Sequence, residues 1–241
     1  MPGLKKGSCL LFLVCLLVPL AVAGEGFWIK KPYQKWSADE TNRLLEESPW
    51  ATTLSLGGIQ SVESTSGVPT NRSSGVEMET DPTITYTLQF RSAKPIREAQ
   101  VRSSQINSHY DKFKADQRAA FDANADKFLA VTFPDRVIVS VTFHTNVQNN
   151  QSLLRNYWAS QSLAKLSMTV YLNTNTERLS LTNYSFKDNT FQFTFPRPKQ
   201  LRPDEKISVE FVHPTINVVG QQRIFQEFSL KNMQVNGELT F

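Results

Sequence analysis

The chain has 241 residues, a formal net charge of +4, three histidines and two cysteines. Lys5 and Lys6 supply two of the positive charges, so the remaining residues carry about +2 (4 minus 2). Nucleic-acid-binding proteins concentrate Lys and Arg on one face. Here basic residues alternate with acidic ones, as in Arg97-Glu98 and Asp111-Lys112. The composition therefore excludes a nucleic-acid-binding protein.

Residues 1–23 read as a signal peptide. Lys5 and Lys6 form a basic start, an apolar run follows, and Ala21-Val22-Ala23 provides an A-x-A cleavage site before Gly24. The apolar run is shorter than the roughly 20 residues that a membrane-spanning helix needs. We therefore expect a secreted or periplasmic protein that contacts a membrane only through this segment. The alternatives are an uncleaved anchor and a lipidated cysteine.

Both cysteines, Cys9 and Cys15, lie within that signal segment. A mature chain starting at Gly24 has no thiol nucleophile, no thiolate metal ligand and no disulfide. Its stability must then come from an apolar core.

Residues 24–56 are predicted to form an N-terminal Trp-rich helical segment. Ser37 and Glu40 have the spacing of a capping box, which starts a helix that Pro49 ends near Ser48. Such a short helix is unstable alone. We expect apolar side chains to clamp it onto the main domain, namely Trp28, Trp36, Leu44 and Trp50.

Two stretches resemble known proteins. The motif of Trp36-Ser37 followed by Ser48-Pro49-Trp50 is similar to the start of uncharacterised secreted proteins from acidobacteria. The stretches Phe228–Met233 and Gly237–Phe241 resemble the ends of the same proteins. This resemblance implies an exported bacterial protein and carries no assigned activity.

Residues 57–82 are rich in Gly, Ser, Thr and Pro and are predicted to be a flexible linker. Residues 83–241 are predicted to be an α+β domain, because several segments alternate apolar and polar residues as strands do. These segments are 83–90, 137–143, 168–172, 179–184, 191–195, 207–211 and 235–241.

Two segments between the strands have helical spacing, 96–131 and 152–165. The expected fold is a mostly antiparallel sheet with helices packed on one face. The competing architecture is a β-sandwich with helical insertions. Tyr110, Tyr157 and Trp158 lie among polar residues and are expected to be exposed.

Asp122, Asn124 and Asp126 have the spacing that opens an EF-hand loop. Lys127 stands where that loop needs Gly, and Phe133 where it needs Glu, so the run is better explained as a solvated helix face. The sequence therefore predicts no metal site and no cofactor.

The histidines, His109, His144 and His213, lie on separate predicted elements, so each is expected at the surface or in a structural hydrogen bond. His213 precedes Pro214 and is placed in a turn. Glu210 interrupts an apolar strand and is expected to face outward into solvent. The chain contains neither a nucleophile elbow nor a phosphate-binding glycine motif.

No catalytic residue can be named from these patterns. The expected function is a non-catalytic binding or structural role in the periplasm or at the cell surface, with a protein or a saccharide as partner. The alternative is a secreted hydrolase with dispersed carboxylates, or with His109, His144 or His213 as a base.

Overall fold

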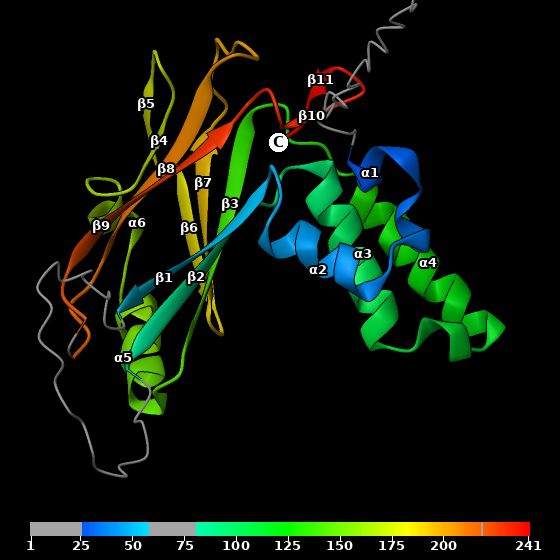
Figure 1. Ribbon diagram of the computed structural model, residues 1–241, viewed down its shortest axis with the longest axis horizontal. Helices are drawn as coiled ribbons and strands as arrows, with labels where there is room; N and C mark the ends of the chain where they lie inside the picture. Colours follow the sequence, from blue (N-terminus) through cyan, green and yellow to red (C-terminus); the bar gives the residue numbers. More distant parts are fainter. Residues whose placement is uncertain (1–25, 58–80, 218) are drawn as a thin grey trace, which may run out of the picture.

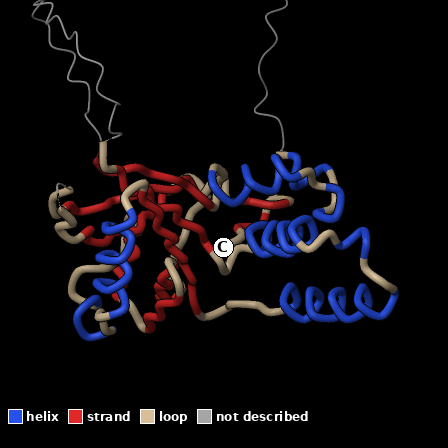
Figure 2. Tube along the Cα trace, turned by 90° about the horizontal axis from the view of Figure 1, so that it is seen from below, coloured by secondary structure: helices blue, strands red, loops and turns tan. Residues whose placement is uncertain are grey.

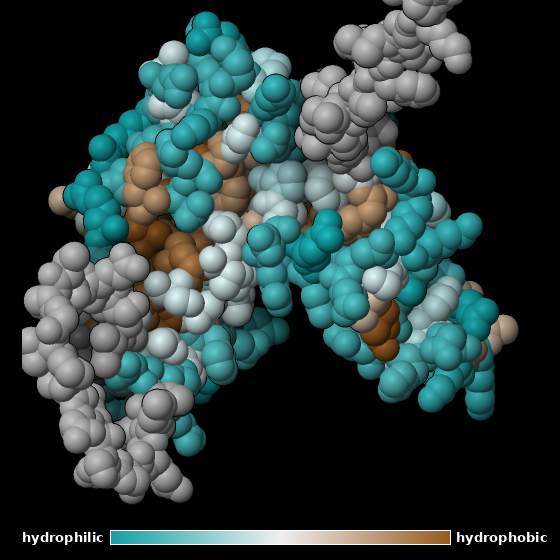
Figure 3. Space-filling view, in the orientation of Figure 1, coloured by the Kyte–Doolittle hydropathy of each residue, from teal (hydrophilic) through white to brown (hydrophobic). Residues whose placement is uncertain are grey.

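The computed structural model describes residues 26–57, 81–217 and 219–241. The predicted signal peptide, 1–23, and nearly all of the predicted linker, 57–82, lie outside the described residues. The described chain has a strand half and a helical half, which lie side by side in two views (Figures 1 and 2). In the space-filling view a hollow separates the two halves on one face (Figure 3).

The first sheet of the strand half has five antiparallel strands in the order β1-β2-β3-β7-β6. They are β1 (Ala51–Gly57), β2 (Thr83–Phe90), β3 (Arg136–Thr145), β7 (Thr190–Pro196) and β6 (Asn183–Lys187).

The second sheet has four antiparallel strands in the order β5-β4-β8-β9. They are β5 (Arg178–Ser180), β4 (Tyr171–Asn173), β8 (Lys206–His213) and β9 (Gln222–Ser229). A separate hairpin of β10 (Gln234–Val235) and β11 (Glu238–Leu239) replaces the single closing strand that 235–241 was expected to form.

The two sheets pack face to face through the apolar residues that the alternation predicts. The Tyr86 ring of β2 lies 5.5 Å from the Phe211 ring of β8, and Phe193 of β7 lies 6.0 Å from Phe211. All three side chains are buried. This interior supplies the core that a chain without disulfides needs, because burial of aromatic side chains dominates core energetics.

The exposure that the sequence suggests for Trp158 is wrong. Trp158 is fully buried, and its ring stacks on Phe191 at 3.9 Å. Its polar sequence neighbours face solvent, but Leu154 and Trp158 are one turn apart and both face the strands. Tyr110 and Tyr157 are half-buried.

Four helices and two short 3-10 turns come from the N-terminal segment and from the chain between β2 and β3. They are α1 (Phe27–Lys30), η1 (Tyr33–Lys35), α2 (Ala38–Glu46), α3 (Lys94–Asn107), η2 (Tyr110–Lys112) and α4 (Ala115–Ala130). Two further helices, α5 (Gln148–Ala159) and α6 (Leu163–Leu166), pack on the strand half.

Helix α2 joins the two halves by packing on the outer face of the first sheet. Gln89 of β2 donates its side-chain Nε2 to the Leu45 carbonyl at 2.7 Å, and the Thr53 hydroxyl of β1 donates to the Glu46 carbonyl at 3.3 Å. The fold is therefore α+β, as expected, and its strand half has the face-to-face sheets of the competing hypothesis.

The N-terminal segment is fixed as its sequence predicts. Ser37 caps α2 by accepting the Glu40 N–H, while Glu40 accepts the Ser37 N–H. Trp36, Leu44 and Trp50 are buried in the common core. Among the described residues no helix is long and apolar enough to cross a membrane.

Candidate functional site

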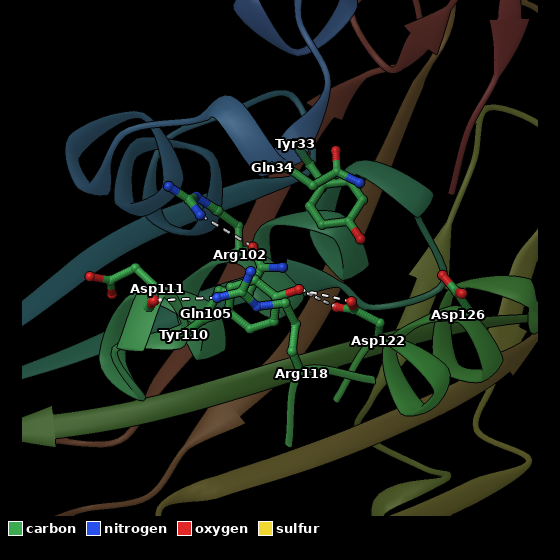
Figure 4. A pocket seen from close by; sticks show the side chains of 9 residues that line it. All are labelled: Tyr33, Gln34, Arg102, Gln105, Tyr110, Asp111, Arg118, Asp122 and Asp126. Atoms are coloured by element: carbon green, nitrogen blue, oxygen red, sulfur yellow. Dashed lines mark hydrogen bonds between the residues drawn. The ribbon is translucent and has the colours of Figure 1, made fainter. Parts of the chain in front are cut away.

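A cleft of about 710 Å³ opens in the helical half between η1, α3, η2 and α4 (Figure 4). Its lining combines phenolic hydroxyls with charged groups of both signs. The side chains that shape it are Tyr33, Arg102, Tyr110, Arg118, Asp122 and Asp126. In the sequence, Tyr33 precedes β1, and the other five residues follow β2.

The wall that carries Tyr33 is tied to α3. The buried Trp36 indole donates its Nε1–H to the Lys31 carbonyl at 3.1 Å, which fixes η1. Arg102 of α3 donates from Nε to the Trp36 carbonyl at 2.8 Å and from Nη1 to Gln105 Oε1 at 3.2 Å. Arg102 therefore holds the wall in place.

The opposite wall depends on a break between α3 and α4. The sequence predicts one helix over 96–131, but His109 adopts a left-handed conformation with φ of 53° and turns the chain. The Tyr110 ring then packs 5.5 Å from Phe113 and 5.3 Å from Phe121. These three half-buried rings meet because the chain turns back between α3 and α4.

A bifurcated hydrogen bond in the cleft joins Tyr110 to Asp122. The Tyr110 hydroxyl donates to both carboxylate oxygens of Asp122, at 2.8 Å each. Burial, and next the Asp122 carboxylate, raise the pKa of Tyr110. The Arg118 guanidinium lies 5.2 Å from the centre of the Tyr110 ring and donates to the Asp111 carbonyl at 3.3 Å. Asp122 is thus an oriented acceptor at the cleft wall.

Tyr33 and Asp126 also line the opening, and the Tyr33 hydroxyl oxygen interacts with the neighbouring Gln34 side chain. The Tyr33 hydroxyl points toward Asp122 and Asp126 in Figure 4. Burial raises the pKa of Tyr33, and the Asp126, Glu98 and Asp122 carboxylates raise it further. Asp126 is exposed, and no hydrogen bond to it occurs within the part of the chain that the structure describes.

Asp122 and Asp126 are one helical turn apart, so their side chains project from the same face of α4. Asp122, Asn124 and Asp126 all lie within α4, which confirms the helical interpretation over an EF-hand loop. Within residues 26–57, 81–217 and 219–241, no group of three or more His, Cys, Asp or Glu could hold a metal ion.

The three histidines lie on different elements. His109 is exposed beside the cleft, and His144 is exposed near the end of β3. His213 is not in a turn but ends β8, where it is fully buried. Its Nδ1 lies 2.7 Å from the Tyr86 hydroxyl, so it is a structural, hydrogen-bonded histidine.

Glu210 differs from the solvated acid that the sequence suggests. It does point away from the sandwich core, but only 5% of it is exposed. Arg178 of β5 and Arg223 of β9 reach over it and form ion pairs with the carboxylate at 3.3 and 2.8 Å. The alternation in β8 correctly predicts that Glu210 lies on the outer face of its sheet. It cannot predict that two long side chains cover that face.

Tyr110, Asp122 and Asp126 were singled out in the sequence, but Tyr33 and Arg118 were not. The sequence gives only a weak local signal for Tyr33 and Arg118. Tyr33 lies in an aromatic stretch, and Arg118 lies in a predicted helix of mixed polarity. The residues of the cleft come together through the turn between α3 and α4 and through Trp36.

No family model matches the chain, and no curated protein matches it. Among solved structures, it is similar to the crystal structure of a novel protein of unknown function from Burkholderia pseudomallei K96243. The two share 15% sequence identity with a TM-score of 0.37, over 58% of this chain and 73% of that chain.

Proposed function

We propose that this chain is an exported bacterial protein that acts by binding, without catalysis, in the periplasm or at the cell surface. The proposed ligand is a saccharide, and the proposed site is the cleft around Tyr110 and Asp122. Export is supported by the leader-like sequence of residues 1–23. A bacterial source is supported by the resemblance of both chain ends to acidobacterial secreted proteins.

The observation that carries the binding site is the convergence of two carboxylates and two phenolic hydroxyls in one open cleft. Saccharides present alternating hydroxyl donors and acceptors beside apolar ring faces. Asp122 and Asp126 offer acceptors, the Tyr33 hydroxyl offers a donor, and tyrosine rings offer apolar surface. The cleft volume of about 710 Å³ falls within the usual range for small-molecule sites, roughly 300–1,000 Å³.

Calorimetric titration of the mature chain with neutral tetrasaccharides, such as cellotetraose, maltotetraose and chitotetraose, tests this proposal. We expect one of them to bind, and Asp126→Asn to weaken that binding about 10-fold, because a hydrogen bond to a charged group contributes roughly 1.5–3 kcal/mol. Tyr33→Phe should also weaken it.

Asp116→Asn is the matched control, because Asp116 is an exposed aspartate in the first turn of the same helix, outside the cleft. Equal binding by Asp126→Asn, Asp116→Asn and the unchanged chain would contradict the cleft as the site. Export is tested separately by expressing the full chain and measuring the mass of the secreted product, which should begin at Gly24.

A secreted hydrolase is the second candidate. The observation that favours it is the spacing of Asp122 and Asp126, since paired carboxylates at a sugar-sized opening are what glycoside hydrolysis uses. Incubation of the same tetrasaccharides with the protein distinguishes the two functions. Shorter products that disappear in Asp126→Asn would favour the hydrolase, and intact tetrasaccharide would favour binding.

A further inference from the structure

The outer face of the four-stranded sheet carries a charged cluster outside the cleft. Its centre is Glu210, whose carboxylate is almost completely buried although the residue points away from the core. Glu210 Oε1 accepts from Arg178 Nη2 at 3.3 Å and from Arg223 Nη1 at 2.8 Å, while Oε2 accepts from Asn173 Nδ2 at 3.2 Å. Three strands, β5, β4 and β9, thus converge on one carboxylate of β8.

This cluster holds more positive than negative charge. Two guanidiniums surround a single carboxylate, which leaves a local charge of +1 (2 minus 1). The side chains of Arg178 and Arg223 are 53% and 67% exposed. Each guanidinium has five N–H donors, and one nitrogen of each bonds to Glu210. Most of the remaining donors are available at the surface, in orientations that the carboxylate fixes.

Apolar side chains flank the two arginines. The Arg178 guanidinium lies 3.8 Å from the centre of the Tyr171 ring, which supports it from one side. Phe225 stands opposite Glu210 in the strand register and is 55% exposed. Met168 is 74% exposed, and its carbonyl accepts the Tyr171 hydroxyl at 2.8 Å.

We propose that this face, defined by Met168, Tyr171, Arg178, Arg223 and Phe225, is a docking surface for a protein partner that presents a carboxylate beside an apolar side chain. Charge complementarity supports an acidic partner. Arg, Met and aromatic residues are the types enriched at protein interfaces. The exposed Phe225 and Met168 side chains are of the kinds that protein partners bury at the centre of an interface, which favours a polypeptide.

The cluster also reduces the entropic cost of binding. An arginine that is already held by Glu210 and by the Tyr171 ring loses less rotamer freedom when a partner docks than a mobile one does. This surface is independent of the saccharide cleft, since the two lie in different halves of the molecule.

Selection of a random displayed peptide library on the mature chain tests the proposal. We expect peptides that combine Asp or Glu with Leu, Phe or Trp to be enriched. Synthetic copies of these peptides should bind at least about 10-fold more weakly to Arg223→Gln and to Phe225→Ser, and more weakly as salt increases. Phe225→Ser leaves the ion pairs intact, so it remains informative if Arg223→Gln is unstable.

Arg155→Gln is the matched control, because Arg155 is an exposed arginine on α5 outside this face. Asp126→Asn separates this surface from the cleft and should leave peptide binding unchanged. Enrichment of no peptides, or of basic ones, would overturn the proposal. So would peptide affinities for Arg223→Gln and Phe225→Ser that equal the affinity for the unchanged chain. Binding of alginate or heparin that depends on Arg223, without peptide enrichment, would overturn it in favour of an acidic polysaccharide.

Discussion

His213 is a neutral side chain kept inside the sandwich by one hydrogen bond to Tyr86. Its other nitrogen, Nε2, is buried and finds no hydrogen-bond partner among the described residues. Protonation would place a proton on both ring nitrogens and leave a buried charge with no compensating acceptor. Burial accordingly lowers the pKa of His213 to about 4.

This pKa predicts a loss of stability in mild acid. In the unfolded chain the pKa of His213 is near 6.5. Between pH 6.5 and 4 the unfolded chain binds a proton that the folded protein does not, so stability falls as pH falls through this window. The loss should be at most about 3 kcal/mol.

Denaturant unfolding of the unchanged chain and of His213→Gln, from pH 7 to pH 4, measures this contribution. The difference between their free energies of unfolding should change with pH, whereas His144→Gln, at an exposed histidine, should follow the unchanged chain. A constant difference between the unchanged chain and His213→Gln would contradict this account.

The capping box of α2 is the clearest prediction at the level of one element. The Ser37 hydroxyl accepts the Glu40 N–H at 3.1 Å, and Glu40 Oε2 accepts the Ser37 N–H at 2.8 Å. Hydrogen bonds from Lys31 and Ser37 lower the pKa of Glu40. Ser37→Ala should reduce the free energy of unfolding by about 1 kcal/mol, and Ser37→Thr should largely preserve it. Equal stability of Ser37→Ala and the unchanged chain, measured in urea, would show that the cap contributes nothing.

The tryptophans of the N-terminal segment test whether that segment belongs to the core. Trp36 is 1% exposed and Trp50 is fully buried. Replacing either by Ala should cost roughly 3–5 kcal/mol, visible as a large drop in the melting temperature. An unchanged midpoint would instead indicate a detachable arm.

Strand alternation was the part of the fold that the sequence predicted best. Ile84, Tyr86, Leu88 and Phe90 are all fully buried, as period-2 spacing requires. Strand β1 was missed because it lies at a sheet edge and is polar on one side, and β9 because Arg223, Phe225 and Glu227 mix charge with an exposed ring. The break between α3 and α4 was missed because no Gly or Pro marks it, only His109 in a left-handed conformation.

At the scale of the whole molecule, the C-terminus links the first sheet to the N-terminal segment. The Trp50 indole donates to the Thr240 carbonyl, and Arg197 donates from Nη1 to the Phe241 carbonyl at 2.7 Å. The Phe241 ring packs 5.8 Å from Phe90. The last residues are therefore part of the core.

Phe241→Ala should consequently lower the free energy of unfolding by roughly 3–5 kcal/mol, as for other buried aromatic residues. Thr215→Ala, at an exposed position, is the control and should have little effect. Urea unfolding followed by tryptophan fluorescence measures both, and a Phe241→Ala curve that overlays the control would show that the C-terminus is dispensable.

The sequence could predict parts of the cleft but not how they come together. Asp122 and Asp126 share a face by helical spacing, but the helix that carries Tyr110 had to end before its hydroxyl could turn back toward Asp122. Tyr33 reaches the cleft only because Trp36 and Arg102 tie η1 to α3. Such long-range contacts leave no periodicity in the sequence. The same limit applies to Glu210, whose arginine partners come from two other strands.

The most direct test of saccharide binding in the cleft is calorimetric titration of the mature chain with cellotetraose, maltotetraose and chitotetraose, repeated with Asp126→Asn and Asp116→Asn. We expect at least one tetrasaccharide to bind, with an affinity weakened about 10-fold by Asp126→Asn and unchanged by Asp116→Asn. Absence of binding, or equal affinity in all three proteins, would contradict it.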